Sequence, residues 1–386
     1  MSDRVEVSRK YFAMTILVSI GFAVLLLCAQ SAWAIDPFTV RKVAVDVTAG
    51  TAAVARESAR KDGQARALRR LFARLVSSSV GNDLPVMEEA TAMFLVQSVE
   101  VDEEKTSAVR YLAKLIYRFK AEEVRDYLRL AGIPYAETVS KPVLILPILR
   151  NGDKAVLWED PNPWRDAWAD MVERDGLVPM IVPFGDLSDM ADVSISEALS
   201  GDKAHLGAIA SRYGGVDSMV AIADYATVSG SNLPKLQITI IRVGVTQQNP
   251  ITLTVTARGL GEQTKMYADG VLVAAEAIED GWREANLLRF EDRRQLAVTV
   301  PLRSLSDWVS VRSRLDGVAV VAGWKLTALT RYTAEVELSL IGDEEQLQQA
   351  LAQADLKLEK EPGPSPGGFE PPLRVLWRSD TAYPKN

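Results

Sequence analysis

The stretch KPVLILPIL, residues 141–149, is a continuous apolar run, and two further runs follow it, LVPMIVP at 177–183 and DSMVAIADY at 217–225. A strand buried on both faces carries such an unbroken run, whereas a half-exposed strand alternates. Helical segments separate the runs, over 163–176 and 203–213. Alternation of strands and helices at this spacing predicts a parallel sheet with right-handed crossovers.

Two strands that resemble a meander continue this unit, LQITIIRVG at 236–244 and ITLTVTARG at 251–259. Short connections of this kind are typical of strands joined by hairpins. A long helix from about Thr264 to Ala285 closes the unit. We therefore place an α/β middle domain with parallel strands at residues 138–290.

An α+β pattern precedes the middle domain, at residues 36–137. Its first strand, FTVRKVAVDVTA at 38–49, changes phase at Arg41 and Lys42, which predicts a β-bulge. A long amphipathic helix over 52–78 and an alternating strand over 109–119 follow. Together these elements predict a small N-terminal α+β domain.

The C-terminal region, residues 292–360, has the element order β-α-β-β-α-β of a ferredoxin-like domain. Residues 361–386 are rich in Pro and Gly at their start and predict a flexible tail. Within this tail, LRVLWR at 373–378 is a candidate edge strand. The predicted fold class is thus α/β and α+β, as small domains in tandem.

Composition limits the chemistry that this chain can perform. The 386 residues carry a formal net charge of −7, with 48% hydrophobic and 25% charged residues, which is ordinary for a globular protein. Nucleic-acid binders usually carry a basic excess, so we expect no nucleic-acid partner. The single Cys28 and the single His205 are too few for a Cys/His zinc site, and no phosphate-binding or dinucleotide motif occurs. We therefore expect no metal, no cofactor and no catalytic residue set.

The N-terminus has the pattern of a secretory signal peptide over residues 1–34. A basic region with Arg9 and Lys10 precedes the apolar stretch 11–29, and small residues end the segment at Ala34. We expect cleavage after Ala34 and a periplasmic mature protein. The apolar stretch approaches the length of a membrane span, so an uncleaved inner-membrane anchor is the alternative. Membrane contact is expected only in that case.

Two polar loops are expected to meet at one edge of the middle sheet, because ligands of open parallel sheets bind outside the carboxyl ends of the strands. These loops, LWEDPNPWRDAW at 157–168 and VPFGDLSDM at 182–190, supply the candidate binding residues Trp158, Asp160, Asn162, Trp164, Asp186 and Asp189. Indoles beside carboxylates are typical of recognition surfaces, which predicts that at least one of Trp158, Trp164 and Trp168 exposes its ring. The alternative is that the indoles anchor the loop and that Asp160 or Asn162 caps the following helix.

A weaker candidate is the basic face of the helix over 52–78, where Arg66, Arg70 and Arg74 recur every four residues. Residues at this spacing line one stripe of a helix, and the stripe predicts contact with an anionic polymer or with lipid headgroups. The alternative is a solvated helix face of mixed charge. Aromatic residues do not alternate with these arginines, which argues against single-stranded nucleic acid.

Several of these segments resemble a known family. The stretches FTVRKVAVDVTAG, ARKDGQARALRRLFARLV, LWEDPNPWRDAW, VPFGDLSDM and RYGGVDSMVAIADY are similar to those of the exported bacterial family named domain of unknown function 2066. The resemblance covers most of the chain after the signal segment and implies neither an activity nor functional residues. More distantly, the first region is similar to the N-terminal domain of the flagellar T-ring protein, and the middle region to small α/β domains of periplasmic envelope proteins. Such proteins are adaptors and scaffolds, which is an analogy of fold only.

Export, tandem small domains and the lack of a catalytic set favour a non-catalytic periplasmic adaptor or scaffold that binds an envelope protein or peptidoglycan. The alternative is a hydrolase of envelope glycans or lipids that uses two carboxylates from Asp160, Asp186 and Asp189. Two carboxyl groups that converge in a deep cleft would favour the hydrolase. A shallow face with aromatic residues at its rim would favour the adaptor.

Overall fold

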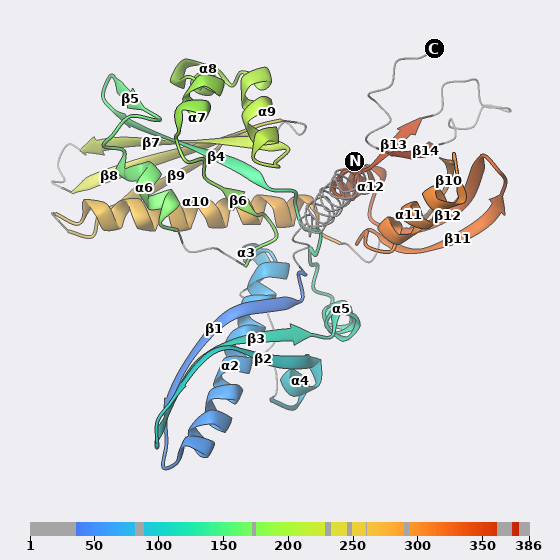
Figure 1. Cartoon of the computed structure of the whole chain (residues 1–386), viewed down its shortest axis with the longest axis horizontal. Coiled ribbons are helices and arrows are strands. Elements are labelled where there is room, and N and C mark those ends of the chain that lie inside the picture. The colour runs from blue at the N-terminus through green and yellow to red at the C-terminus, as the bar shows by residue number, and fades with distance from the viewer. Residues whose placement is uncertain are drawn as a thin grey trace, which may run out of the picture. The chain divides into compact units, whose positions relative to one another are not determined.

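The computed structural model of the protein is a mixed α/β structure whose strands form three sheets (Figure 1). It describes residues 36–81, 89–171, 175–227, 233–244, 249–259, 261–288, 293–360 and 373–377. The expected signal peptide, residues 1–34, lies outside the described residues. The three sheets belong to one compact unit that begins at Pro37. No helix in the described part of the chain combines the length and the apolar character that a membrane span needs.

The first sheet is antiparallel, in the order β1-β3-β2. Its elements are β1 (Thr39–Thr48), α2 (Ala52–Leu75), α3 (Ser78–Gly81), α4 (Glu89–Leu95), β2 (Val96–Thr106), β3 (Arg110–Phe119) and α5 (Ala121–Leu130). Alternate residues of β3 are buried, and α2 packs against that face with Leu68, Leu71 and Leu75. The other face stays polar, as an antiparallel sheet with a single buried face allows.

The β-bulge predicted in the first strand is confirmed. The register of β1 against β3 shifts between Val40 and Val43, and Lys42 has the left-handed φ of 52°. A residue with a side chain adopts this conformation only at a cost, which the contacts around it must offset. Both Arg41 and Lys42 are held through their backbone by residues outside the sheet, as described below.

The second sheet has the order β5-β4-β7-β8-β9, and β6 also pairs with β4. Its elements are β4 (Val143–Asn151), β5 (Lys154–Val156), α6 (Pro163–Ala169), β6 (Met180–Ile181), α7 (Leu187–Asp192), α8 (Ile195–Ser200), α9 (Lys203–Arg212), β7 (Asp217–Thr227), β8 (Pro234–Val243), β9 (Ile251–Thr256) and α10 (Gln263–Ala285). Strand β4 is parallel to both β6 and β7, which confirms the predicted parallel core. The meander is confirmed too, because β8 pairs antiparallel with β7 and β9.

The second parallel strand is much shorter than predicted. Only Met180 and Ile181 of the run 177–183 pair with β4. Proline lacks the N–H that a ladder requires, and Pro179 and Pro183 flank this pair on both sides. The chain after Ile181 has no regular secondary structure until α7. The loop after β6 therefore begins two residues before the predicted end of the strand.

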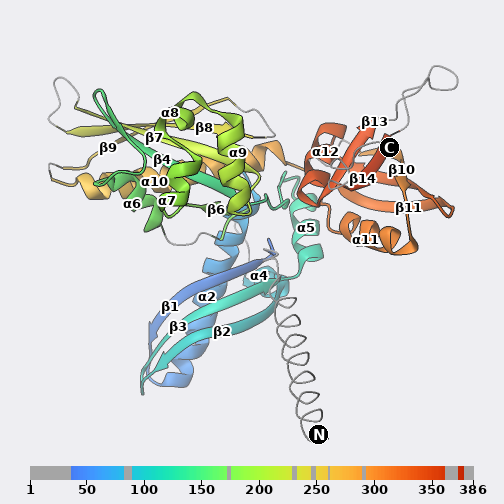
Figure 2. The same ribbon diagram turned by 45° about the horizontal axis from the view of Figure 1, so that its top comes forward.

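Helices cover both faces of the second sheet (Figure 2). On one face, α6 packs against β4 and α10 against β8 and β9, and the buried Trp164, Trp168 and Trp282 belong to the core on that face. On the other face, Leu206 and Ile209 of α9 are buried with residues of β4 and β7. The loops that follow β5 and β6 therefore lie at an edge of the sheet, between the two cores.

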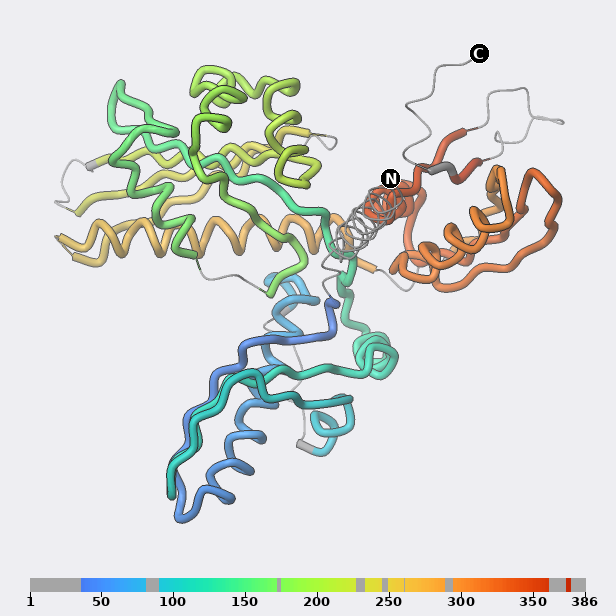
Figure 3. Tube along the Cα trace, in the orientation of Figure 1, coloured from blue at the N-terminus to red at the C-terminus, as the bar shows by residue number. Residues whose placement is uncertain are grey.

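The third sheet has five strands, in the order β11-β12-β10-β14-β13. Its elements are β10 (Arg293–Pro301), α11 (Leu305–Leu315), β11 (Val321–Leu329), β12 (Thr333–Ile341), α12 (Glu344–Gln353), β13 (Leu356–Lys360) and β14 (Leu373–Trp377). The element order β-α-β-β-α-β is present, and β14 is an addition to it. Figure 3 follows this part of the chain.

Strand β14 corrects the predicted flexible tail over 361–386. Residues 373–377 pair antiparallel with β13 and parallel with β10, so they lie inside the sheet rather than at its edge. Leu373 and Val375 are buried in the same core as α11 and α12. Burial of these two side chains and pairing on both sides stabilise the strand. The other residues of this predicted tail lie outside the described residues.

Helix α10 supplies a direct test of the packing. A Cβ added at Gly270 would lie 3.0 Å from Leu236, 3.1 Å from Trp164 and 3.2 Å from Ile238, whereas one added at Gly281 meets nothing within 4 Å. We expect Gly281→Ala to raise the free energy of unfolding by about 0.5–1 kcal/mol, because alanine favours helix. Gly270→Ala is expected to lower it by about 1 kcal/mol or more, because the core is overpacked. Urea denaturation measures both, and an equal gain from the two variants would contradict the close packing.

Candidate functional site

The three tryptophans of the first predicted loop are buried. Trp158, Trp164 and Trp168 expose 8%, 0% and 1% of their surface, so the expectation that one of these rings faces solvent is wrong. The indole N–H of Trp158 donates to Val193 O at 2.7 Å, and that of Trp164 donates to Ala221 O at 2.9 Å. These rings anchor the loop to the sheet, because burying a large aromatic side chain removes much apolar surface from water and so stabilises the fold.

Asn162 and Asp160 also stabilise the local structure of the first loop and the start of α6. Asn162 is fully buried and caps α6, where its side-chain oxygen accepts from Arg165 N at 3.0 Å. Its amide nitrogen donates to Leu157 O at 3.1 Å. Asp160 is exposed and pairs with Arg165 at 2.5 Å. The structural alternative for this loop, indole anchors and a capped helix start, therefore accounts for its residues.

The two aspartates of the second loop form a capping box at the start of α7. Asp186 accepts from Ser188 N and Asp189 N, and Asp189 accepts in return from Asp186 N. The Asp189 side chain is fully buried and bonds Gly185 N at 2.7 Å and Arg212 Nη2 at 2.6 Å. A buried charge is stable only when it is paired and hydrogen-bonded, and this carboxylate is both.

Tyr213 also binds this loop by hydrogen bonds. Its hydroxyl donates to the Asp189 carboxylate, with oxygen–oxygen distances of 2.9 and 3.0 Å, and accepts from Phe184 N at 3.2 Å. Burial, together with the negative charge of Asp189, raises the pKa of Tyr213, so the phenol stays protonated as a donor. The backbone between Phe184 and Asp189 is therefore fixed at several points from α9 and its C-terminal turn.

The two predicted loops do meet. A Cβ built on Gly185 would lie 3.4 Å from both the Trp158 ring and the Arg165 guanidinium, which places the second loop directly on the first. Gly185 has a φ of 74°, a conformation that glycine adopts without strain. The two predicted loops thus lie side by side as expected, although the first follows the unpredicted strand β5 rather than β4 and its tryptophans are buried.

The same loop exposes large apolar side chains that the sequence reasoning missed. Phe184 is 87% exposed, Leu187 is 84% exposed and Met190 is 43% exposed. We call these three residues the rim patch. Phe184 and Leu187 lie within the stretch that had been singled out for its aspartates, and the only signal was the presence of large apolar residues in a polar loop. Phe184 precedes α7 and the other two lie on it, and large exposed apolar side chains close together in one segment mark a candidate interaction site.

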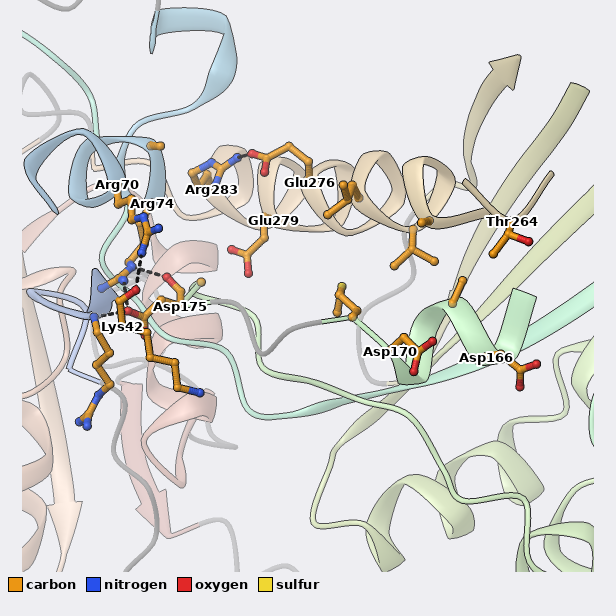
Figure 4. A pocket seen from close by; sticks show the side chains of 18 of the residues that line it. Lys42, Arg70, Arg74, Asp166, Asp170, Asp175, Thr264, Glu276, Glu279 and Arg283 are labelled. Carbon is orange, nitrogen blue, oxygen red and sulfur yellow. Dashed lines mark hydrogen bonds and ion pairs between the residues drawn. The ribbon is translucent and has the colours of Figure 1, made fainter. Parts of the chain in front are cut away.

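A second candidate site is a cavity of about 890 Å³ beside α10 (Figure 4). Its lining residues come from β1 and α2 on one side, from α6 and its following loop on another, and from α10 along its length. Five cationic and five anionic side chains are among them. Ligand sites are preferentially found in cavities of this size between packed units.

Several of these charges hold the protein together. Arg74, whose side chain is 2% exposed, donates to Thr39 O at 2.8 Å and to Pro37 O at 2.7 Å, and it pairs with Asp175 at 3.1 Å. Asp175 also accepts from Arg41 N, in the bulge of β1. Glu279, 3% exposed, accepts from Leu177 N and Val178 N at 3.0 and 3.1 Å. These groups tie the bulge and the loop before β6 in place.

The predicted basic stripe on α2 has a structural role. Arg66 donates to Ala44 O at 3.0 Å, Arg70 to Lys42 O at 3.3 Å and Arg74 to Thr39 O at 2.8 Å. Strand β1 is the edge of its sheet, and its outward carbonyl groups need partners. Arginines one helical turn apart supply them, so this stripe is accounted for without an anionic ligand.

Each carboxylate proposed for a hydrolase has a structural partner. Asp160 pairs with Arg165, Asp186 caps α7, and Asp189 holds Arg212. Within the described residues, no group of three or more His, Cys, Asp and Glu side chains is placed to hold a metal ion. His205 is exposed and lies 3.3 Å from Glu197 and from Asp202, on a surface rather than in a cleft.

Comparison with known proteins adds no assignment. No protein-family model matches the chain, and no curated protein matches it. The resemblance to domain of unknown function 2066 stays a prediction. The argument for function therefore rests on the geometry of the rim patch and of the cavity.

The network under the rim patch gives a testable prediction. Asp189→Asn removes a fully buried negative charge, which we expect to lower the free energy of unfolding by about 3 kcal/mol. Asp192→Asn is the matched control, because Asp192 pairs with the same Arg212 but its side chain is 34% exposed. Its cost is expected to stay below about 1 kcal/mol. Chemical denaturation decides, and similar losses in both variants would mean that Asp189 does not hold the loop.

Proposed function

We propose that this protein is a non-catalytic adaptor of the bacterial periplasm that binds an envelope protein through the rim patch. The observation that carries the proposal is the pair Phe184 and Leu187, 87% and 84% exposed, on either side of Gly185 and Asp186, whose backbone N–H groups donate to a buried carboxylate. Large apolar side chains in water lower stability and solubility unless a partner covers them. A rigid support removes the cost of ordering the loop when the partner binds.

The chemistry around the rim patch favours one kind of partner segment. Ion pairs lie in the same segments, with Asp160, 80% exposed, paired to Arg165 and Asp192, 34% exposed, paired to Arg212. A segment that brings apolar side chains to Phe184 and Leu187 and polar groups to these ion pairs would match both features. Apolar anchors of this kind are typical of contacts between proteins, which favours a protein over peptidoglycan as the partner.

The hydrolase alternative receives no support from the described residues. A glycosidase needs two carboxyl groups that face each other across a substrate, roughly 5–10 Å apart. Each of Asp160, Asp186 and Asp189 instead holds an arginine or a helix start. A carboxylate that is fully engaged in structure is poorly placed to transfer a proton.

We extend the proposal to the architecture and the compartment. The three sheets would correspond to three tandem domains, the third being ferredoxin-like with β14 added between β10 and β13. Export through the signal segment, cleaved after Ala34 or retained as an anchor, would place these domains in the envelope. Several small domains without a catalytic set are suited to bringing partners together.

Photo-crosslinking in intact cells tests the proposal. We expect a benzoyl-phenylalanine placed at position 184 or 190 to form a discrete adduct, and one placed at position 130 to form none. Leu130 is the matched control, because it is 89% exposed on a different surface, at the end of α5. No adduct at 184 or 190 above that at 130 would refute the adaptor function of this patch.

The double substitution Phe184→Ala/Leu187→Ala should weaken the adduct formed from position 190. We expect a loss of affinity of about 2 kcal/mol, or roughly 30-fold, as for interface anchors. The melting temperature should hardly change, because substitution of exposed side chains alters stability by only about 0.5 kcal/mol. A large fall in melting temperature would mean that the two side chains pack against the protein, contrary to the exposed arrangement.

A further inference from the structure

The cavity beside α10 has features that the rim patch does not explain. Its lining residues on α10 run from Thr264 to Arg283. At roughly 1.5 Å per helical residue this distance is about 28 Å, so the cavity is a groove. A polypeptide in extended conformation spans the same length with about eight residues, at roughly 3.3 Å each.

The two ends of this groove differ in charge. Arg41, Lys42 and Arg70 line the end formed by β1 and α2, whereas Asp166 and Asp170 line the end formed by α6. Figure 4 shows the labelled basic side chains at one end, together with Asp175, which pairs with Arg74, and Asp166, Asp170 and Thr264 at the other. The lining carries equal numbers of positive and negative side chains, so it offers no excess of charge to a polyanion. A ligand that fits must itself carry separated charges.

Small or flexible apolar side chains also line the groove, and we call them its apolar floor: Ala167 and Met171 from α6 and the chain after it, and Ala268, Val271 and Leu272 from α10. Small side chains leave room along the helix, and Met adapts its shape to what it contacts. No aromatic residue occurs among the described lining residues. Stacking platforms for nucleic-acid bases are therefore lacking among them.

We infer that this groove is a second binding site, which takes an extended polypeptide segment of a partner, acidic at the end that meets Arg41, Lys42 and Arg70 and basic at the end that meets Asp166 and Asp170. Opposite charges at the two ends fix the direction of the segment, and the apolar floor receives its middle residues. An anionic lipid fits less well, because its tail would lie beside Asp166 and Asp170. With the rim patch as the first site, a second site would let one chain hold two partners.

Fluorescence anisotropy with a defined peptide tests the inference on the full chain. The probe is a fluorescein-labelled octapeptide with two Glu at one end, alternating Ala and Leu in the middle and two Lys at the other end. We expect saturable binding, and about tenfold weaker binding when Gln replaces all Glu and Lys. Equal binding of the two peptides, or no saturation below roughly 1 mM, would overturn the inference.

Two matched pairs of variants locate the site. Ala268→Trp fills the groove and should abolish binding, whereas Val273→Trp, on the same helix but outside the lining, should not. Arg41→Gln should weaken binding about tenfold, because only the backbone of Arg41 takes part in the bulge contacts described above, whereas Arg69→Gln, on α2 outside the lining, should leave it within about twofold. Thermal melts confirm that each variant is folded. Binding that survives Ala268→Trp and Arg41→Gln in folded protein would overturn the inference.

The double variant Phe184→Ala/Leu187→Ala separates the two sites. It should bind the octapeptide as well as the unchanged protein does, because neither residue lines the groove. Loss of peptide binding in this variant would place the peptide on the rim patch and contradict a separate site. Peptide binding without any adduct at position 184 would instead refute the adaptor proposal and leave the groove standing.

Discussion

The close approach of α10 to the second sheet is the constraint on which the other features depend. At Gly270 the helix lies so near the sheet that a Cβ would contact Leu236, Trp164 and Ile238. Further along, Glu279 binds the backbone N–H groups of Leu177 and Val178, and Trp282 donates to Thr138 O at 2.7 Å. Gly176 belongs to this arrangement, since a side chain there would collide with the Glu279 carboxylate. One helix therefore sets the sheet core, the chain entering β6 and one wall of the groove.

Charged groups in this protein act mainly as structural links. Arg74 joins the start of β1 to Asp175, and Ser78 N donates to Asp280 at 3.0 Å. Burial and the hydrogen bonds from Ser78 act in opposite directions on Asp280, and the net effect lowers its pKa. A carboxyl with a lowered pKa stabilises the fold at neutral pH, and that contribution is lost as the pH falls through the lowered value. Such links explain why so many carboxylates line the candidate sites without forming a reactive pair.

Local patterns in the sequence predicted the parts of the fold that depend on local physics. Unbroken apolar runs identified β4 and β7, and the phase slip at Arg41 and Lys42 identified the bulge. The place of β14 was not predictable in this way: it enters the sheet between β13 and β10, and β10 lies far from it in sequence. The residue types of the candidate loop also misled, because its tryptophans suggested recognition but lie in the core, whereas Phe184 and Leu187, which had not been singled out, lie in solvent. Whether a side chain is exposed depends on which layers close over it, and this follows only from the assembled sheet and helices.

The central claim is that the loop carrying Phe184 and Leu187 is held rigid in the free protein, as a preformed binding surface. Amide hydrogen exchange at Gly185, followed by NMR, tests it most directly, because Gly185 N donates to the buried carboxylate of Asp189 at 2.7 Å. The account predicts slow exchange at this amide and faster exchange in the Asp189→Asn variant. Exchange of the Gly185 amide in the unchanged protein at the rate of an unstructured peptide would contradict it.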